Sequence, residues 1–99
     1  MPGLDIDLQD GFINDRVIVR IDNTEVFNQG SIKSNKMLGL AEQIHSACQG
    51  RRALVSVNVT NRNLEREVEI SLDHITALGV SIVDDALFIR ESDAPFGYA

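Results

Sequence analysis

The sequence has few of the residues that build disulfides, stacking surfaces and chain bends. Cys48 is the only cysteine among 99 residues, so no disulfide forms within the chain and a hydrophobic core must hold the fold. Tryptophan is absent. The aromatic residues are Phe12, Phe27, Phe88, Phe96 and Tyr98. Because sites for sugars and nucleobases commonly stack them on exposed rings, this scarcity disfavours both ligands, although polar side chains on a sheet can still bind sugar.

Basic residues are also few. Nine lysines and arginines face fifteen aspartates and glutamates, and the net charge is −6. Nucleic acids and anionic membranes are bound mainly by clustered basic side chains, and the only adjacent basic pair is Arg51–Arg52, so neither partner is expected. No apolar run approaches the roughly 20 residues that span a bilayer. Acidic residues stand where the basic start of a signal peptide would lie, so we expect a cytoplasmic protein.

What the chain does contain is a series of short β-type stretches separated by turn residues. In the first stretch Val17, Val19 and Ile21 fall on one face, as in a half-buried strand. The stretches predicted to be strands are residues 16–21, 24–27, 53–59, 67–72, 79–83 and 86–90. Tight turns are predicted at Asp22–Asn23 and Asp84–Asp85, because these side chains tolerate positive φ.

Residues 31–50 admit two interpretations. Met37, Leu40, Ala41, Ile44 and Cys48 have helical spacing, which predicts a helix near residues 35–48. Against it, Gly39 costs about 1 kcal/mol in a helix interior, and several of the same positions also fit a period of two. The helix fits slightly better locally, whereas the surrounding strands favour a strand over residues 42–48.

The fold class follows from the spacing of these stretches. Strands recur about every ten residues, with one polar face on several of them, as in antiparallel sandwiches and barrels. No repeat, linker or low-complexity tract divides the chain. We therefore predict a single domain over residues 1–99, an antiparallel β-sandwich of six to seven short strands. The alternative is an α+β fold with one helix near residues 35–48.

The stretch 5–15, DIDLQDGFIND, has the composition of a calcium loop. An EF-hand loop requires oxygen ligands at positions 1, 3 and 5, glycine at 6 and glutamate at 12, and no register of this segment meets all of these. Calcium held between loops at one end of a sandwich stays open as a hypothesis. Its candidate ligands are Asp10, Asp15, Asp84 and Asp85. The favoured interpretation is that these are solvated turn residues, with Phe12 and Ile13 packed beneath the sandwich.

Catalytic chemistry has little support. His45, Cys48 and His74 are the only soft metal ligands, and on a strand His45 and Cys48 would point to opposite faces. No nucleophile elbow or glycine-rich phosphate loop occurs. We therefore expect no enzyme activity, no cofactor and no metal centre.

The C-terminus places Phe96 and Tyr98 within the last four residues, where most chains fray. One interpretation is that both rings fold back over an open end of the sandwich. The other is that they anchor a second subunit or a partner, since Phe and Tyr are enriched in interface cores.

Two segments carry a resemblance. Residues 16–27 resemble the strand, polar turn and Glu-Val-Phe hairpin of many bacterial β-sandwich accessory binding modules. The end, residues 92–98, is similar to the terminus of a family of small bacterial proteins without assigned function. The resemblance implies a small β-sandwich and supports a strand near residues 42–48, but it transfers no functional residues.

These observations together predict a non-enzymatic interaction module that self-associates or docks on a partner protein. The absence of a catalytic constellation, the sheet edges that need protection and the aromatic tail all favour this function. The alternative is a carbohydrate- or calcium-dependent binding module whose ligand the sequence does not identify.

Overall fold

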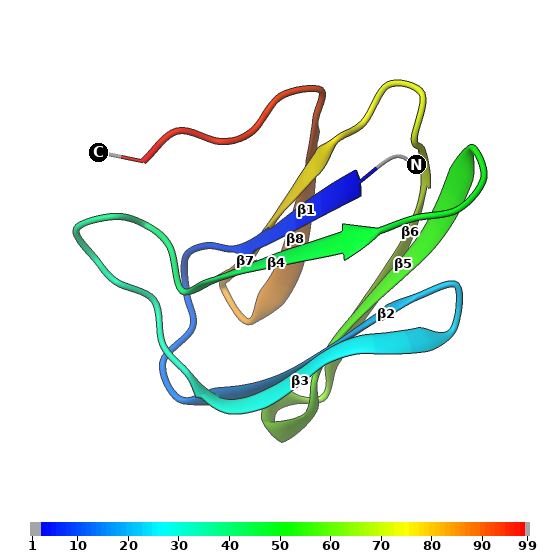
Figure 1. Ribbon diagram of the computed structural model, residues 1–99. Coiled ribbons are helices and arrows are strands. Elements are labelled where there is room, and N and C mark those ends of the chain that lie inside the picture. The colour runs from blue at the N-terminus through cyan, green and yellow to red at the C-terminus, as the bar shows by residue number, and fades with distance from the viewer. Residues whose placement is uncertain (1–2, 99) are drawn as a thin grey trace.

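Two four-stranded β-sheets pack face to face in the computed structural model, which describes residues 3–98 (Figure 1). The strands are β1 (Gly3–Leu8), β2 (Asp15–Ile21), β3 (Thr24–Ile32), β4 (Glu42–Ala47), β5 (Arg52–Val59), β6 (Leu64–Ser71), β7 (Ala77–Val83) and β8 (Ala86–Ser92). A 3₁₀ turn, η1 (Thr60–Arg62), joins β5 to β6, and no α-helix occurs in the described residues. None of them forms a helix suited to crossing a membrane. The predicted all-β sandwich is confirmed, with eight strands rather than six or seven.

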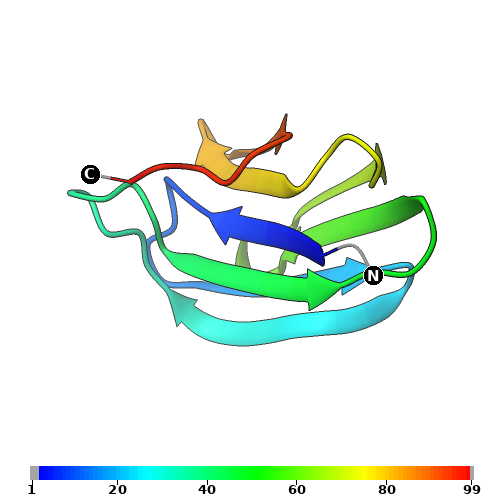
Figure 2. The same ribbon diagram turned by 45° about the horizontal axis from the view of Figure 1, so that its top comes forward.

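The two sheets consist of three hairpins, β2–β3, β5–β6 and β7–β8, together with the strands β1 and β4. The first sheet has the order β4-β1-β7-β8 and the second β3-β2-β5-β6. β1 pairs with β7 in parallel, whereas every other ladder is antiparallel. Along one side of the sandwich β3 lies against β4 (Figure 2). Along the other, Arg66 Nη1 donates to the Leu87 carbonyl at 3.3 Å and so joins the edge strands β6 and β8.

The strand that the sequence analysis missed is β1. Leu4, Ile6 and Leu8 are fully buried between the sheets, while Asp5 and Asp7 lie on the outer face of the first sheet. This is the period of two expected of a strand with one core face. The number of acids in residues 5–15 suggested a loop, yet half of those acids alternate with core residues.

The ambiguous segment is a turn followed by a strand, so the strand favoured over residues 42–48 is confirmed and the alternative helix near residues 35–48 is wrong. The Asn35 side chain accepts hydrogen bonds from the backbone N–H groups of Met37 and Leu38 at 2.9 and 3.3 Å. Gly39 has φ +69°, which reverses the chain before β4. β4 then pairs with β1 and buries Ile44 in the core.

Loop 9–14 closes one end of the sandwich, which we call the loop end. Phe12 is buried there, as predicted, but Ile13 is 69% exposed, so its predicted packing is wrong. The loop approaches the β7–β8 hairpin so closely that a Cβ on Gly11 would lie 2.0 Å from the Ile82 carbonyl oxygen. Gly11 also has φ +92°, so both space and backbone require glycine at this position.

We therefore expect Gly11→Ala to destabilise the protein by more than about 3 kcal/mol, because backbone strain and a backbone clash add. Gly50→Ala is the matched control. Gly50 also has positive φ, +80°, but nothing lies within 4 Å of the point that an added Cβ would occupy, so only the strain of about 1–2 kcal/mol applies. Urea unfolding of the two variants measures the difference. Equal losses would contradict the close approach at Gly11.

Candidate functional site

The loop end is built around a buried carboxylate. Asp15 was predicted to be solvated, but its residue exposure is only 1%. Its Oδ1 accepts hydrogen bonds from Asn61 Nδ2 at 2.7 Å and Arg62 Nε at 2.8 Å. Its Oδ2 accepts from the Ile13 N–H and from Arg62 Nη2, both at 2.9 Å. Burial raises the pKa of the Asp15 carboxyl, but the bonds from Arg62, Ile13 and Asn61 outweigh burial and hold that pKa below its ordinary value.

Arg62 extends this arrangement to other segments of the loop end. Its Nη2 donates to the Gly11 carbonyl at 3.2 Å, and its Nη1 lies 3.5 Å from Asp85 Oδ1. Two of the four calcium candidates, Asp15 and Asp85, thus converge on a guanidinium. Asp10 and Asp84 are exposed and lie outside this arrangement. Within residues 3–98 no three His, Cys, Asp or Glu side chains are grouped to hold a metal ion.

The other candidate ligands are separated by their positions. His45 lies on β4, where its Nδ1 is 2.5 Å from Asp5 Oδ1 on β1. Cys48 is buried at the end of β4, and burial, together with the charge of Asp22, raises the pKa of its thiol. A raised pKa favours the inert thiol over the nucleophilic thiolate at neutral pH. His74 is exposed in the turn between β6 and β7.

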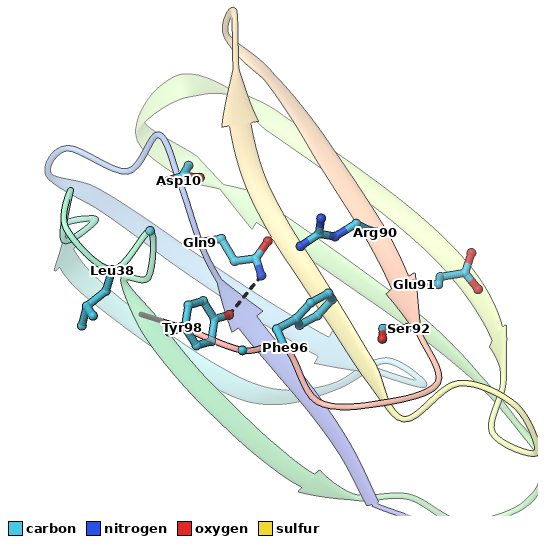
Figure 3. Close-up of a pocket in the computed structure, with 10 residues that line it drawn as sticks. Gln9, Asp10, Leu38, Arg90, Glu91, Ser92, Phe96 and Tyr98 are labelled. Carbon is cyan, nitrogen blue, oxygen red and sulfur yellow. Dashed lines mark hydrogen bonds between the residues drawn. The ribbon is translucent and has the colours of Figure 1, made fainter.

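The C-terminal tail, residues 93–98, folds back on the outer face of the first sheet rather than over an open end (Figures 1 and 3). The Tyr98 hydroxyl donates to Asp7 Oδ2 at 2.6 Å and accepts from Gln9 Nε2 at 3.0 Å. Figure 3 shows the Phe96 ring beside Arg90, whose Cζ lies 4.7 Å from the ring centroid, within range of a cation–π contact. Both predicted interface residues, Phe96 and Tyr98, are half-buried against their own chain.

The residues that receive the tail were not found in the sequence. Asp7 and Gln9 are 3% and 7% exposed, and each is bonded to the Tyr98 hydroxyl. A Cβ on Gly79 would lie 2.5 Å from Gln9 Oε1, so bare backbone on β7 leaves the space that Gln9 occupies. The available signal was that the single tyrosine needs a hydrogen-bond partner when it is buried.

An apolar surface surrounds the loop end. We call this surface the apolar end. It consists of the large hydrophobic side chains that are most exposed among residues 3–98, which are Ile13, Met37, Leu38, Val83 and Phe88. Three hollows meet at Asp10. Leu38 lines the first, Val83 and Phe88 line the second, and Ile13 lines the third. The hollow next to the tail has a volume of about 520 Å³ and is shown in Figure 3. The sequence did not reveal this surface, because exposure of an apolar residue depends on which loops meet.

For the buried carboxylate we expect Asp15→Asn to lower the free energy of unfolding at pH 7 by about 2–3 kcal/mol. The amide NH₂ of asparagine would face N–H groups that now donate hydrogen bonds to the carboxylate. The folded-state pKa of Asp15 lies below its unfolded value, so its contribution is present above a pH of about 4 and is lost as the pH falls further. Urea unfolding between pH 7 and pH 3 should therefore show a shallower decline for the variant than for the wild type.

The control for this measurement is Asp85→Asn. The Asp85 side chain is 90% exposed, so its pair with Arg62 contributes less than about 1 kcal/mol. A loss for Asp85→Asn as large as that for Asp15→Asn would show that burial does not set the strength of these pairs.

Because Tyr98 is the only tyrosine and tryptophan is absent, ultraviolet absorbance of the phenolate reports the tail alone. Burial, followed by the hydrogen bond to Asp7, raises the pKa of the Tyr98 hydroxyl above 10.0. The contact is therefore fully present below a pH of about 10 and is lost as the pH rises through the folded-state pKa. We expect Asp7→Asn to lower this pKa toward 10, and Asp5→Asn, on the same face but bonded to His45, to leave it unchanged. A Tyr98 that titrates identically in all three proteins would refute the docked tail.

No known protein family, no curated protein and no solved structure matches this chain. The resemblance to bacterial accessory modules stays a prediction, and the geometry of the loop end and the tail carries the functional argument.

Proposed function

We propose that the protein is a non-enzymatic interaction module that docks on a protein surface through its apolar end. The observation that carries the proposal is the location of Ile13, Leu38, Val83 and Phe88 in three hollows that meet at Asp10, with the exposed Met37 next to Leu38 in the chain. Single exposed apolar residues are common on proteins, whereas apolar residues gathered in one place with a polar rim are typical of interaction sites.

The remaining surfaces are less suited to docking. The outer face of the second sheet carries charged and polar side chains, among them the exposed pair Arg52–Glu69. The edge strand β6 presents Glu65, Arg66 and Glu67, and charges of this kind on an edge oppose pairing with another sheet. The Tyr98 hydroxyl is already bonded to Asp7 and Gln9 of its own chain, which makes the tail less suited to bind a partner.

A second candidate function has one observation in its favour. The hollow beside the tail combines the rings of Phe96 and Tyr98 with Gln9, Asp10 and Arg90, a mixture of apolar walls and polar groups that suits a small polar ligand such as a sugar. The hollow is open and mainly polar, which favours weak binding, and we place this function second.

Site-specific photo-crosslinking in the protein's native cells tests the proposed function. A photoreactive amino acid replaces Met37 or Phe88 in the apolar end, and Glu67 on the outer face of the second sheet serves as the control. We expect the first two positions to give adducts of defined mass in several-fold higher yield than Glu67. Apolar and aromatic residues are enriched in the buried core of an interface, so a crosslinker at these positions would lie against the partner. Equal yields at all three positions, or the highest yield at Glu67, would overturn the proposal.

A further inference from the structure

Charges of opposite sign lie on the two sides of loop 9–14. The chain's only lysines, Lys33 and Lys36, share a hollow with Phe12, Ile13 and one acid, Asp10. The hairpin tip that joins β7 to β8 carries Asp84 and Asp85. Figure 1 shows loop 9–14 lying between the segment 33–41 and this hairpin.

Hydrogen bonds fix the loop to both neighbours. The Ile82 N–H donates to the Asp10 carbonyl at 2.8 Å, next to the hairpin tip. The Phe12 N–H donates to Ser34 Oγ at 3.0 Å, and Ser34 lies between the two lysines. Loop 9–14, which carries Ile13, is therefore tied on one side to the segment with the two lysines and on the other to the hairpin with the two aspartates.

These charges are available for a partner. Lys33, Lys36 and Asp84 are exposed, and none of them forms an ion pair with a residue between 3 and 98. Asp85 is held only by the exposed 3.5 Å pair with Arg62. The two lysines are also two of only nine basic residues in a chain of net charge −6.

A twofold axis requires a surface that is complementary to itself. If the axis passes near Ile13, rotation by half a turn places the lysines of one copy opposite the hairpin tip of the other, twice. A different acidic partner would match only the lysines and would leave Asp84 facing like charge. We propose that the occupant of the apolar end is a second copy of this chain, in a twofold dimer that pairs Lys33 and Lys36 with Asp84 and Asp85 around Ile13.

The inference rests on the proposed function, and charge exchange in the full chain tests it. Sedimentation velocity from micromolar to millimolar protein measures the dimer dissociation constant of each variant. We expect Lys33→Glu with Lys36→Glu to raise this constant roughly tenfold or more, because like charges then face each other, and Asp84→Lys to do the same. An equimolar mixture of these two proteins should restore dimerisation, since each supplies the sign that the other needs. One chain that carries all three substitutions should dimerise alone.

The controls separate this pairing from net charge and from folding. Arg51→Glu with Arg52→Glu, and Asp73→Lys, change the net charge by the same amounts at exposed positions away from the loop end, and they should leave the constant unchanged. Asp84 has φ +50°, where lysine is strained, so Asp84→Asn provides a second variant that tolerates this backbone and should weaken the dimer less. Thermal unfolding checks that every protein is folded.

The outcomes also separate this inference from the proposed function. A wild-type chain that stays monomeric at every concentration overturns the dimer, while photo-crosslinks from Met37 and Phe88 to another protein would still support docking. The twofold pairing is overturned if the wild type forms a dimer that none of the charge exchanges weakens. It is also overturned if the equimolar mixture of the two variants does not dimerise. Equal crosslinking at the control position overturns the proposed function itself.

Discussion

The carboxylate of Asp15 accepts four hydrogen bonds at the point where β2 begins, and the arrangement of the loop end depends on them. Three of the donors come from η1, and one comes from the backbone of loop 9–14. Through Arg62 the same charge reaches the Gly11 carbonyl and Asp85. These bonds outweigh the cost of burying the carboxylate and hold its pKa below the ordinary value, so the ionised group stabilises the fold and also fixes the positions of η1 and loop 9–14. The geometry that it fixes is the one that exposes Ile13.

Two adjoining parts of the first sheet's outer face use hydrophobic side chains differently. Tyr98 and Phe96 contact their own chain, where buried Asp7 and Gln9 satisfy the phenol and Arg90 lies over the ring. Val83 and Phe88, on the neighbouring hairpin, remain exposed. The tail therefore covers the polar part of this face and leaves the apolar part open. A chain that used the tail only to hide apolar surface would have covered Phe88 instead.

The sequence predicted the sandwich because its strands alternate in the regular way: Val17, Val19 and Ile21, or Val55, Val57 and Val59, show their core face without any tertiary information. It predicted the turns at Asp22–Asn23 and Asp84–Asp85 for a similar reason, and all four residues have positive φ. It failed where composition and periodicity disagreed, as in β1, whose acids suggested a loop. It also failed where distant segments meet, because neither the burial of Asp15 by Arg62 nor the contact of Tyr98 with Asp7 has a local signal. The loop end and the apolar surface around it are formed by contacts of this kind, between segments that are distant in the sequence.

The parallel pairing of β1 with β7 has a consequence for the order in which this chain folds. β1 occupies the interior of its sheet, and its partners are β4 and β7, which follow it after about one third and three quarters of the sequence. The fully buried Leu4, Ile6 and Leu8 are thus synthesised before either of the strands that pair with β1. Chains dominated by such distant pairings close their loops slowly, in milliseconds to seconds, and expose apolar strands meanwhile. Asp5 and Asp7 alternate with these residues in the sequence, and charges placed in this way oppose aggregation of an unpaired apolar strand.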